Sequence, residues 1–345
     1  MSPMITSILI LNLATGTIIT MSSYHWLLAW MGLELNTMAI LPIISKSHHP
    51  RSTEASTKYF LTQTAASALI LFASITNAQT TGQWNILQLE NPLAQTLLTI
   101  ALAMKLGLAP THFWLPEVLQ GTSFKTTLII ITWQKLAPMA LMLLTWNQTS
   151  MLTITMMGAL SVVIGGLGGL NQTQLRKIIA FSSIAHLGWM ATIITKSNKL
   201  ALLNLTLYIL ISTPLMLSLI FTSMKTTQDL TTSWTTSPML SSLTMMTLLS
   251  LGGLPPLTGF LPKWLTLEEL LTQNMTPLAT ILAVTTLLSL FFYMRLSYSL
   301  SMTISPSPTK ITSKWRLKAK TSTLLLSMTL PMSIMGLPLV PLMKP

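Results

Sequence analysis

The segments MKLGLAPTHFWLPEVLQG (residues 104–121) and LLSLGGLPPLTGFLPKW (residues 248–264) decide the fold of this chain. Each is apolar enough to lie in a membrane, yet each contains helix-breaking Gly and Pro residues and a Lys near one end. Within a bilayer, backbone groups freed by such breaks are tolerated only where protein or water satisfies them. The stretches 106–116 and 251–262 share Leu-Gly, a proline, an aromatic residue and Leu-Pro if one residue of slip is allowed. We therefore predict two discontinuous helices in corresponding halves of the chain, a pattern typical of ion pathways in repeat-built transporters.

The composition of the whole chain requires a membrane around these segments. Of the 345 residues, 50% are hydrophobic and 8% are charged, and the mean hydropathy is +0.63. A soluble domain carries about 25% charged residues. The seven acidic side chains cannot cover the surface of a soluble protein of this size. The predicted fold class is therefore all-α and polytopic.

Windows of about 20 mostly apolar residues, the length that crosses a bilayer, predict about eleven transmembrane helices. The chain, 1–345, is predicted to be a single transmembrane domain. Its first half-repeat covers roughly 24–146 and is truncated at its N-terminus, its second covers roughly 151–297, and a C-terminal helix covers 322–343. The spans are 4–22, 24–44, 59–78, 95–120, 126–146, 151–170, 177–195, 200–223, 238–263, 274–297 and 322–343, and the longer connections are 45–58, 78–94, 224–237 and 298–321.

The basic residues predict the orientation of the chain. The formal net charge of +12 would suit nucleic-acid binding, but the basic residues lie between spans, where they set topology. Counting one crossing per span, the side that holds the N-terminus also holds Lys46, Arg51, Lys58, Lys125, Arg176, Lys177, Lys225, Arg295, Lys310, Lys314, Arg316, Lys318 and Lys320, whereas the opposite side holds Lys196, Lys199 and Lys344. The positive-inside rule then places the N-terminus on the negative, cytoplasm-like face and the C-terminus on the opposite face.

Two ionisable residues lie deep in the first half of the chain. Glu34 is close to the centre of its span, where a charged group costs about 2.5–3.5 kcal/mol on insertion scales. It is either a packing carboxyl bonded to a neighbouring helix or a group that binds protons or pairs with a charge. Lys105 lies before Pro110, and His112 follows it by about two helical turns. The alternatives for Lys105 are a snorkelling side chain at a kink and a functional ammonium in polar surroundings.

Three further ionisable residues follow along the chain. Lys135 lies near the middle of its span, just before a proline, and is either a proton carrier or half of a structural ion pair. Low dielectric disfavours a buried ammonium, which makes such a group able to give up its proton. His186 lies mid-span in 177–195 and is either a satisfied core residue or part of a proton relay. Lys263 closes the second broken segment.

Residues and motifs that would carry redox, nucleotide or metal chemistry are absent from the sequence. The absence of cysteine removes disulfides, iron–sulfur ligation and thiolate metal sites. No phosphate-binding loop, dinucleotide fingerprint or metal-ligand spacing occurs, and the pair His48–His49 belongs to a predicted loop. The glycine-rich stretch 165–172 ends a span and favours close helix packing. We therefore expect no cofactor and no metal in this chain.

Five long segments carry a resemblance along nearly the whole chain: PRSTEASTKYFLTQ (50–63), MKLGLAPTHFWLPEVLQG (104–121), TWQKLAP (132–138), GGLNQTQLRKIIAFSSIAHLGWM (168–190) and LLSLGGLPPLTGFLPKW (248–264). They are similar to the chain 2 family of animal mitochondrial NADH–ubiquinone oxidoreductase, respiratory complex I. This family looks like an antiporter-type subunit that lacks its first three helices, and the resemblance therefore implies antiporter-like inverted repeats.

The resemblance implies a proton-pumping subunit of NADH:ubiquinone reductase in the mitochondrial inner membrane, with the N-terminus on the matrix side. The redox chemistry, with FMN, iron–sulfur clusters and ubiquinone, would take place in other subunits. The partners would be other membrane-arm subunits, including neighbouring antiporter-like subunits, accessory subunits and lipids, but no nucleic acid. The family's proton-relay residues match Glu34, Lys105, Lys135, Lys263, His112 and His186. Two alternatives remain open: a stand-alone cation/proton antiporter, and a structural subunit whose buried charges are silent.

Overall fold

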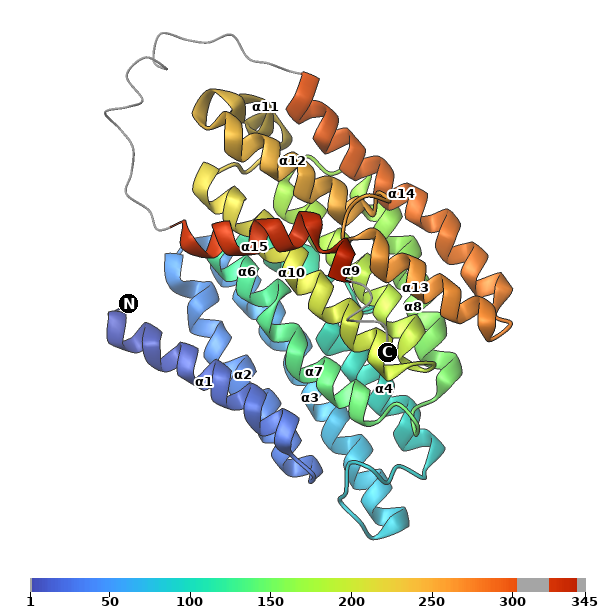
Figure 1. Cartoon of the computed structure of the whole chain (residues 1–345). Coiled ribbons are helices and arrows are strands. Elements are labelled where there is room, and N and C mark those ends of the chain that lie inside the picture. Colours follow the sequence, from blue (N-terminus) through green and yellow to red (C-terminus); the bar gives the residue numbers. More distant parts are fainter. Residues whose placement is uncertain (1, 303–322, 340–345) are drawn as a thin grey trace. The chain divides into compact units, whose positions relative to one another are not determined.

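The computed structural model describes residues 2–302 and 323–339, and the regular elements in them are helices (Figure 1). The elements are α1 (Pro3–Ser22), α2 (Trp26–Ile44), η1 (Ser45–Ser47), α3 (Pro50–Thr81), α4 (Pro92–Leu106), α5 (Trp114–Gly121), α6 (Phe124–Ile131), α7 (Trp133–Leu144), α8 (Met151–Gly169), α9 (Leu175–Ile194), α10 (Asn198–Thr222), α11 (Thr227–Thr236), α12 (Pro238–Gly252), α13 (Phe260–Thr272), α14 (Thr276–Met302), α15 (Leu324–Met335) and η4 (Leu337–Leu339).

Eight described segments are long and apolar enough to cross a membrane, with α6 and α7 counted as one segment. Three shorter apolar helices, α4, α12 and α15, accompany them. The all-helical membrane class predicted from the composition is confirmed. The C-terminal end of the predicted span 322–343 lies outside the described residues, as does most of the predicted connection 298–321 with its five basic residues.

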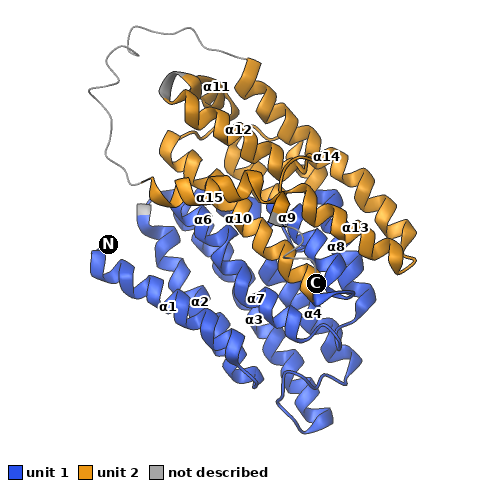
Figure 2. Cartoon of the chain, in the orientation of Figure 1, with its two compact units in different colours: residues 1–164, 183–198 blue, residues 165–182, 199–345 orange. Residues whose placement is uncertain are grey.

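The chain divides into two compact units, which Figure 2 distinguishes by colour. Unit 1 comprises residues 1–164 and 183–198, and unit 2 comprises residues 165–182 and 199–345. Each unit contains one of the two glycine- and proline-rich segments, and each is described by itself below. The division cuts helices α8 and α9, so it does not follow helix boundaries.

Close contact between α1 and α2 forms one edge of unit 1. A Cβ added at Gly16 would lie 2.9 Å from the carbonyl oxygen of Gly32, and one added at Gly32 would lie 2.8 Å from that of Gly16. Small residues let the backbones of two membrane helices approach closely. The resulting van der Waals packing stabilises the helix pair, because lipid provides no hydrophobic driving force for association. Asn36 lies one turn from Gly32 and is buried against this contact.

Helix α3 begins nine residues before the predicted span 59–78. Pro50 occupies its first turn, the side chain of His49 accepts a bond from the N–H of Arg51 at 3.2 Å, and the hydroxyl of Ser52 accepts one from the N–H of His49. These caps satisfy backbone donors that a helix start leaves free. The prediction of a connection over 45–58 is therefore wrong from residue 50 onward.

Two further predictions require correction. The span 126–146 is interrupted at Thr132, where the φ and ψ angles of −102° and −69° separate α6 from α7. The predicted connection 224–237 contains helix α11, which begins at a capping box between Thr226 and Asp229. This helix is polar, so a search for apolar windows passes over it.

The glycine-rich end of α8 packs closely within unit 2, as its sequence predicted. A Cβ added at Gly168 would lie 2.3 Å from the ring of Phe181, and one added at Gly169 would lie 2.8 Å from the ring of Phe292. The glycines of the stretch 165–172 thus let helices pack closely together. This packing lets α14 lie against the end of α8.

Candidate functional site

The first broken helix interrupts unit 1 between α4 and α5. Gly107 ends α4 in the left-handed conformation, with a φ of 79°, and its N–H donates to the carbonyl of Ala103 at 2.8 Å. A residue with a Cβ is disfavoured at such a φ. The following segment, residues 108–113, contains Pro110 and is not helical. The break leaves the last carbonyl groups of α4 available inside the protein.

The second broken helix has the same geometry in unit 2. Gly253 ends α12 with a φ of 79°, and α13 begins seven residues later at Phe260, just as α5 begins at Trp114, seven residues after Gly107. Matching the two glycines aligns the segments without an insertion, so the one-residue slip allowed from the sequence is wrong. In this register Glu117 corresponds to Lys263.

A buried lysine binds the last carbonyl of the first half-helix in each break. The ammonium of Lys135, on α7, donates to the carbonyl oxygen of Leu106, the last residue of α4. The ammonium of Lys263, on α13, donates to the carbonyl oxygen of Gly252, the last residue of α12, at 2.8 Å. A positive charge is favoured there, because the C-terminus of a helix carries the negative end of its dipole. Two lysines from different places in the sequence thus occupy equivalent positions.

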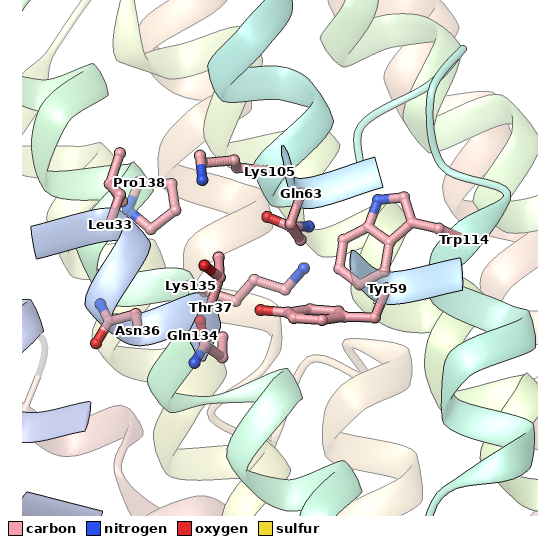
Figure 3. A pocket seen from close by; sticks show the side chains of 10 residues that line it. All are labelled: Leu33, Asn36, Thr37, Tyr59, Gln63, Lys105, Trp114, Gln134, Lys135 and Pro138. Atoms are coloured by element: carbon pink, nitrogen blue, oxygen red, sulfur yellow. The ribbon is translucent and has the colours of Figure 1, made fainter. Parts of the chain in front are cut away.

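Lys105 and Lys135 line one cavity in unit 1 (Figure 3). The cavity volume is about 10 Å³, about the smallest that admits one water molecule. The ammonium of Lys105 lacks a hydrogen-bond partner among the described residues, as do Asn36 Oδ1 and Gln134 Nε2. The full lining is Leu33, Asn36, Thr37, Tyr59, Gln63, Lys105, Trp114, Gln134, Lys135 and Pro138. Burying so many donors and acceptors in an apolar bundle costs free energy unless water or protein groups satisfy their hydrogen bonds.

Glu34 lies on α2 within electrostatic reach of Lys105 and of the Tyr59 hydroxyl. Its Oε2 atom is buried and has no hydrogen-bond partner among the described residues. Glu34 Oε2 and Lys105 Nζ are both without a hydrogen-bond partner among the described residues, so these two groups interact at a distance rather than in contact. Lys135 likewise has no carboxylate partner there, which argues against the structural ion pair considered for it.

The two candidate histidines occupy different surroundings. His112 is buried in the non-helical segment of the first break, with its ring centroid 4.2 Å from that of Phe113. His186 lies in α9, in the part of that helix that belongs to unit 1. Neither lines the cavity that Lys105 and Lys135 share. Lys263 belongs to unit 2.

Several site residues were not singled out from the sequence. Tyr59, Gln63 and Gln134 line the cavity, and so do Asn36 and Trp114. The sequence feature that could have identified some of them is a polar side chain within a predicted span. An amide in an apolar window is unusual for the same reason as a charged side chain there. That signal applies to the three amides but not to the two aromatic residues, which are common in membrane helices.

An ion-pair cluster attaches α5 to α3 beside this site. Lys58 binds Glu54 on its own helix and Glu117 of α5, the latter at 2.7 Å. At the end of α5, a Cβ added at Gly121 would lie 2.5 Å from the carbonyl oxygen of Arg51. The second half of the broken helix is therefore held firmly on α3. Among the described residues, no group of His, Asp and Glu side chains is arranged to hold a metal ion.

Comparisons with known protein families decide the identity of the fold. A model described as "NADH:quinone oxidoreductase/Mrp antiporter, TM" matches residues 23–289, and one described as "NADH dehydrogenase subunit 2 C-terminus" matches residues 290–344. The chain is 58% identical over 343 residues to NADH-ubiquinone oxidoreductase chain 2 of Varanus timorensis, covering 99% of both chains. The chain belongs to the NADH–ubiquinone oxidoreductase chain 2 family. The resemblance found in the sequence is confirmed.

Solved structures agree with this membership. The fold is similar to a chain of respiratory complex I from Thermus thermophilus, with a TM-score of 0.82 and 28% identity over 98% of this chain and 79% of that one. It is also similar to a chain of the Mrp complex from Dietzia sp., with a TM-score of 0.75 and 16% identity over 97% of this chain and 76% of that one. The latter likeness shows the antiporter-type fold alone. As a member of the chain 2 family, the protein is a multi-pass subunit of a respiratory membrane complex.

Proposed function

We propose that this subunit of NADH–ubiquinone oxidoreductase translocates protons across the mitochondrial inner membrane through a buried relay. The relay comprises Glu34, Lys105, Lys135, His112, His186 and Lys263. The N-terminus lies on the matrix side and the C-terminus on the intermembrane-space side. Redox chemistry in other subunits drives the relay, and neighbouring antiporter-like and accessory subunits flank this one.

The observation that carries the proposal is the cavity that Lys105 and Lys135 share in unit 1. Two ammonium groups that line one small cavity in a medium of low dielectric repel each other. Charging both costs more than charging either, so a proton on one lysine promotes loss of the proton from the other. The unpartnered donors and acceptors around the cavity can bind water that carries the proton between them.

Glu34 determines which lysine holds the proton. Its carboxylate attracts the ammonium of Lys105, whereas the ammonium of Lys135 is held by the Leu106 carbonyl and needs no carboxylate. Protonation or displacement of Glu34 removes the attraction for Lys105 alone. The proton on Lys105 then becomes the one that leaves. The chain thereby converts a change at one carboxylate into release of a proton.

The second half of the relay rests on the likeness of the two breaks. Lys263 binds the end of α12 as Lys135 binds the end of α4. We propose that the first half-repeat, about 24–146, and the second, about 151–297, each bring one such lysine, and that His186 passes the proton between them. A helix end stabilises an ammonium without an acidic partner. Each lysine can therefore accept and release a proton without forming a permanent ion pair.

The test is a Glu34→Gln variant of the intact complex, reconstituted in vesicles. Protons moved per NADH oxidised are measured with a pH-sensitive dye, at matched amounts of assembled complex. We expect a lower proton yield with NADH oxidation largely preserved. Glu90→Gln, which changes an exposed carboxylate in a loop, is the matched control and should pump normally. Full stoichiometry in the Glu34→Gln complex would refute the proposal, and sodium-driven transport by the isolated chain would favour the antiporter alternative.

A further inference from the structure

Trp114 spans the first break from one half-helix to the other. It is the first residue of α5, and its side chain is only 6% exposed. Its indole N–H donates to the carbonyl oxygen of Met104, in the last turn of α4, at 3.1 Å. The bond crosses the non-helical segment 108–113 and so fixes the ring relative to the end of α4. Trp114 therefore supports the broken helix at the point where its backbone gives no support.

The face of this ring is directed toward the ammonium of Lys135. The Nζ atom lies 5.4 Å from the ring centroid, within the ~6 Å range of a cation–π interaction. Lys135 is 1% exposed, so water screens the attraction little. The negative face of the indole thus supplements the Leu106 carbonyl as a partner for the charge. Together they replace the carboxylate that a buried ammonium normally needs.

A second aromatic side chain fixes the orientation of the indole. Tyr59 of α3 meets the ring edge-on, with centroids 5.7 Å apart and an interplanar angle of 69°. Edge-to-face pairs of this kind contribute about 0.5–1.5 kcal/mol beyond burial. The bond to Met104 O on one side and Tyr59 on the other leave the indole little freedom to turn away from Lys135. Figure 3 shows these side chains around the cavity.

The second break contains a different aromatic residue at the equivalent position. Phe260 opens α13 as Trp114 opens α5, but it has no N–H to donate and its ring lies parallel to that of Trp264, with centroids 6.3 Å apart. Lys263 belongs to the same helix as Phe260 and binds the end of α12 directly. The lysine that comes from a separate helix, Lys135, is the one with an indole beneath it. The indole is therefore a feature of the first break and its lysine.

We propose that Trp114 is a positioning residue for the proton on Lys135, holding the ammonium against the end of α4 through the face of its indole ring. The inference rests on the proposed function, because it gives Trp114 a role only if Lys135 carries a proton during pumping. A desolvated cation–π contact favours the charged form of the lysine over the neutral form by about 30-fold. Loss of the ring face should shift the proton distribution between Lys135 and Lys105 by about that factor.

The test compares variants of the intact complex in vesicles, by protons moved per NADH oxidised. Trp114→Phe keeps an aromatic face and should pump within about twofold of the unchanged complex. Trp114→Leu removes the face and should approach the lower yield of Lys135→Met. Trp114→Leu combined with Lys135→Met should pump no less than Lys135→Met alone, because the ring acts only through the ammonium. Trp133→Leu, the same change on a 41% exposed ring of α7, is the matched control and should pump normally.

Separate results overturn the inference and the proposed function. Equal losses in Trp114→Phe and Trp114→Leu, or a Trp114→Leu loss that persists in the Lys135→Met background, would show that the ring face of Trp114 does not act through the Lys135 ammonium. Normal pumping by Lys135→Met would refute the relay itself. If Trp114→Leu fails to assemble, Trp114→Met fills the space with a flexible apolar side chain. Trp114→Met is then compared with Trp114→Phe and tested in the Lys135→Met background in the same way.

Discussion

A single methyl group at Gly253 should displace Lys263 from the end of α12. In Gly253→Ala, the new Cβ would lie 2.9 Å from the Nζ atom of Lys263, 3.0 Å from its Cδ and 3.1 Å from its Cε. The flexible lysine would move away and lose its bond to the Gly252 carbonyl. A hydrogen bond to a charged group contributes about 1.5–3 kcal/mol, and an alanine at a positive φ costs about 1–2 kcal/mol. We expect a total cost of about 2.5–5 kcal/mol.

Two other glycines provide matched controls for backbone strain. Gly107→Ala places a methyl group at the same φ in the first break, but its nearest neighbour is a Trp114 ring atom at 3.4 Å, an ordinary contact. Gly82→Ala has a φ of 72° and nothing within 4 Å. Both variants should therefore cost only the strain of about 1–2 kcal/mol. The difference between Gly253→Ala and these two isolates the displacement of Lys263.

The assay measures thermal stability of the assembled complex and protons moved per NADH oxidised in vesicles. Gly253→Ala should lose both stability and proton yield, whereas Gly107→Ala and Gly82→Ala should lose a little stability and keep the yield. Equal proton yields in all three variants would refute the role given to the Lys263 contact. Equal stability losses would show that the methyl group at 253 is accommodated without moving the lysine.

Three further changes test the fold around the site. Lys58→Met leaves the carboxylates of Glu54 and Glu117 without their shared cation and should lower the thermal unfolding temperature slightly; adding Glu117→Gln should restore most of that loss. Gly121→Ala places a methyl group 2.5 Å from a carbonyl oxygen of α3 and should cost about 1–3 kcal/mol, seen as less assembled complex on native gels. Partial burial raises the pKa of Asp229, but bonds from two backbone N–H groups outweigh it and hold that pKa below its usual range. The carboxylate therefore stabilises α11 above about pH 4 and loses this effect as pH falls through its lowered pKa. When hydrogen exchange is corrected for the intrinsic pH dependence of amide exchange, α11 should lose protection below pH 4 in the unchanged protein. In Asp229→Asn the protection of α11 should be about fivefold lower at pH 7 and should change little with pH.

The apolar windows and the glycine and proline clusters of the chain were sufficient to predict most of the membrane helices and the breaks at Gly107 and Gly253. Apolar windows locate membrane helices because lipid requires about 20 such residues. The breaks at Gly107 and Gly253 were recognisable because glycine and proline have few other reasons to cluster in a span. The start of α3 at Pro50 was missed because its cap depends on side chains of a polar loop. The break at Thr132 was missed because no glycine or proline lies at the point where the helix stops.

The site itself was only partly predictable. Glu34, Lys105 and Lys135 stand out because a charge is expensive in an apolar span. That Lys135 binds Leu106 O, 29 residues earlier in the chain, depends on tertiary packing that no local pattern encodes. Trp114 carries no charge, and its contacts with the ammonium and with α4 become visible only in three dimensions. The sequence therefore pointed to the residues proposed as proton carriers but not to the groups that contact them.

The proton yield of a Lys105→Met complex tests the central claim most directly. Lys105 lines the cavity, lacks a hydrogen-bond partner among the described residues and interacts with Glu34, so every step proposed for the first half of the relay involves it. Measured in vesicles at matched NADH oxidation and matched assembly, the variant should move fewer protons per NADH than the unchanged complex. An unchanged number of protons per NADH would contradict the relay.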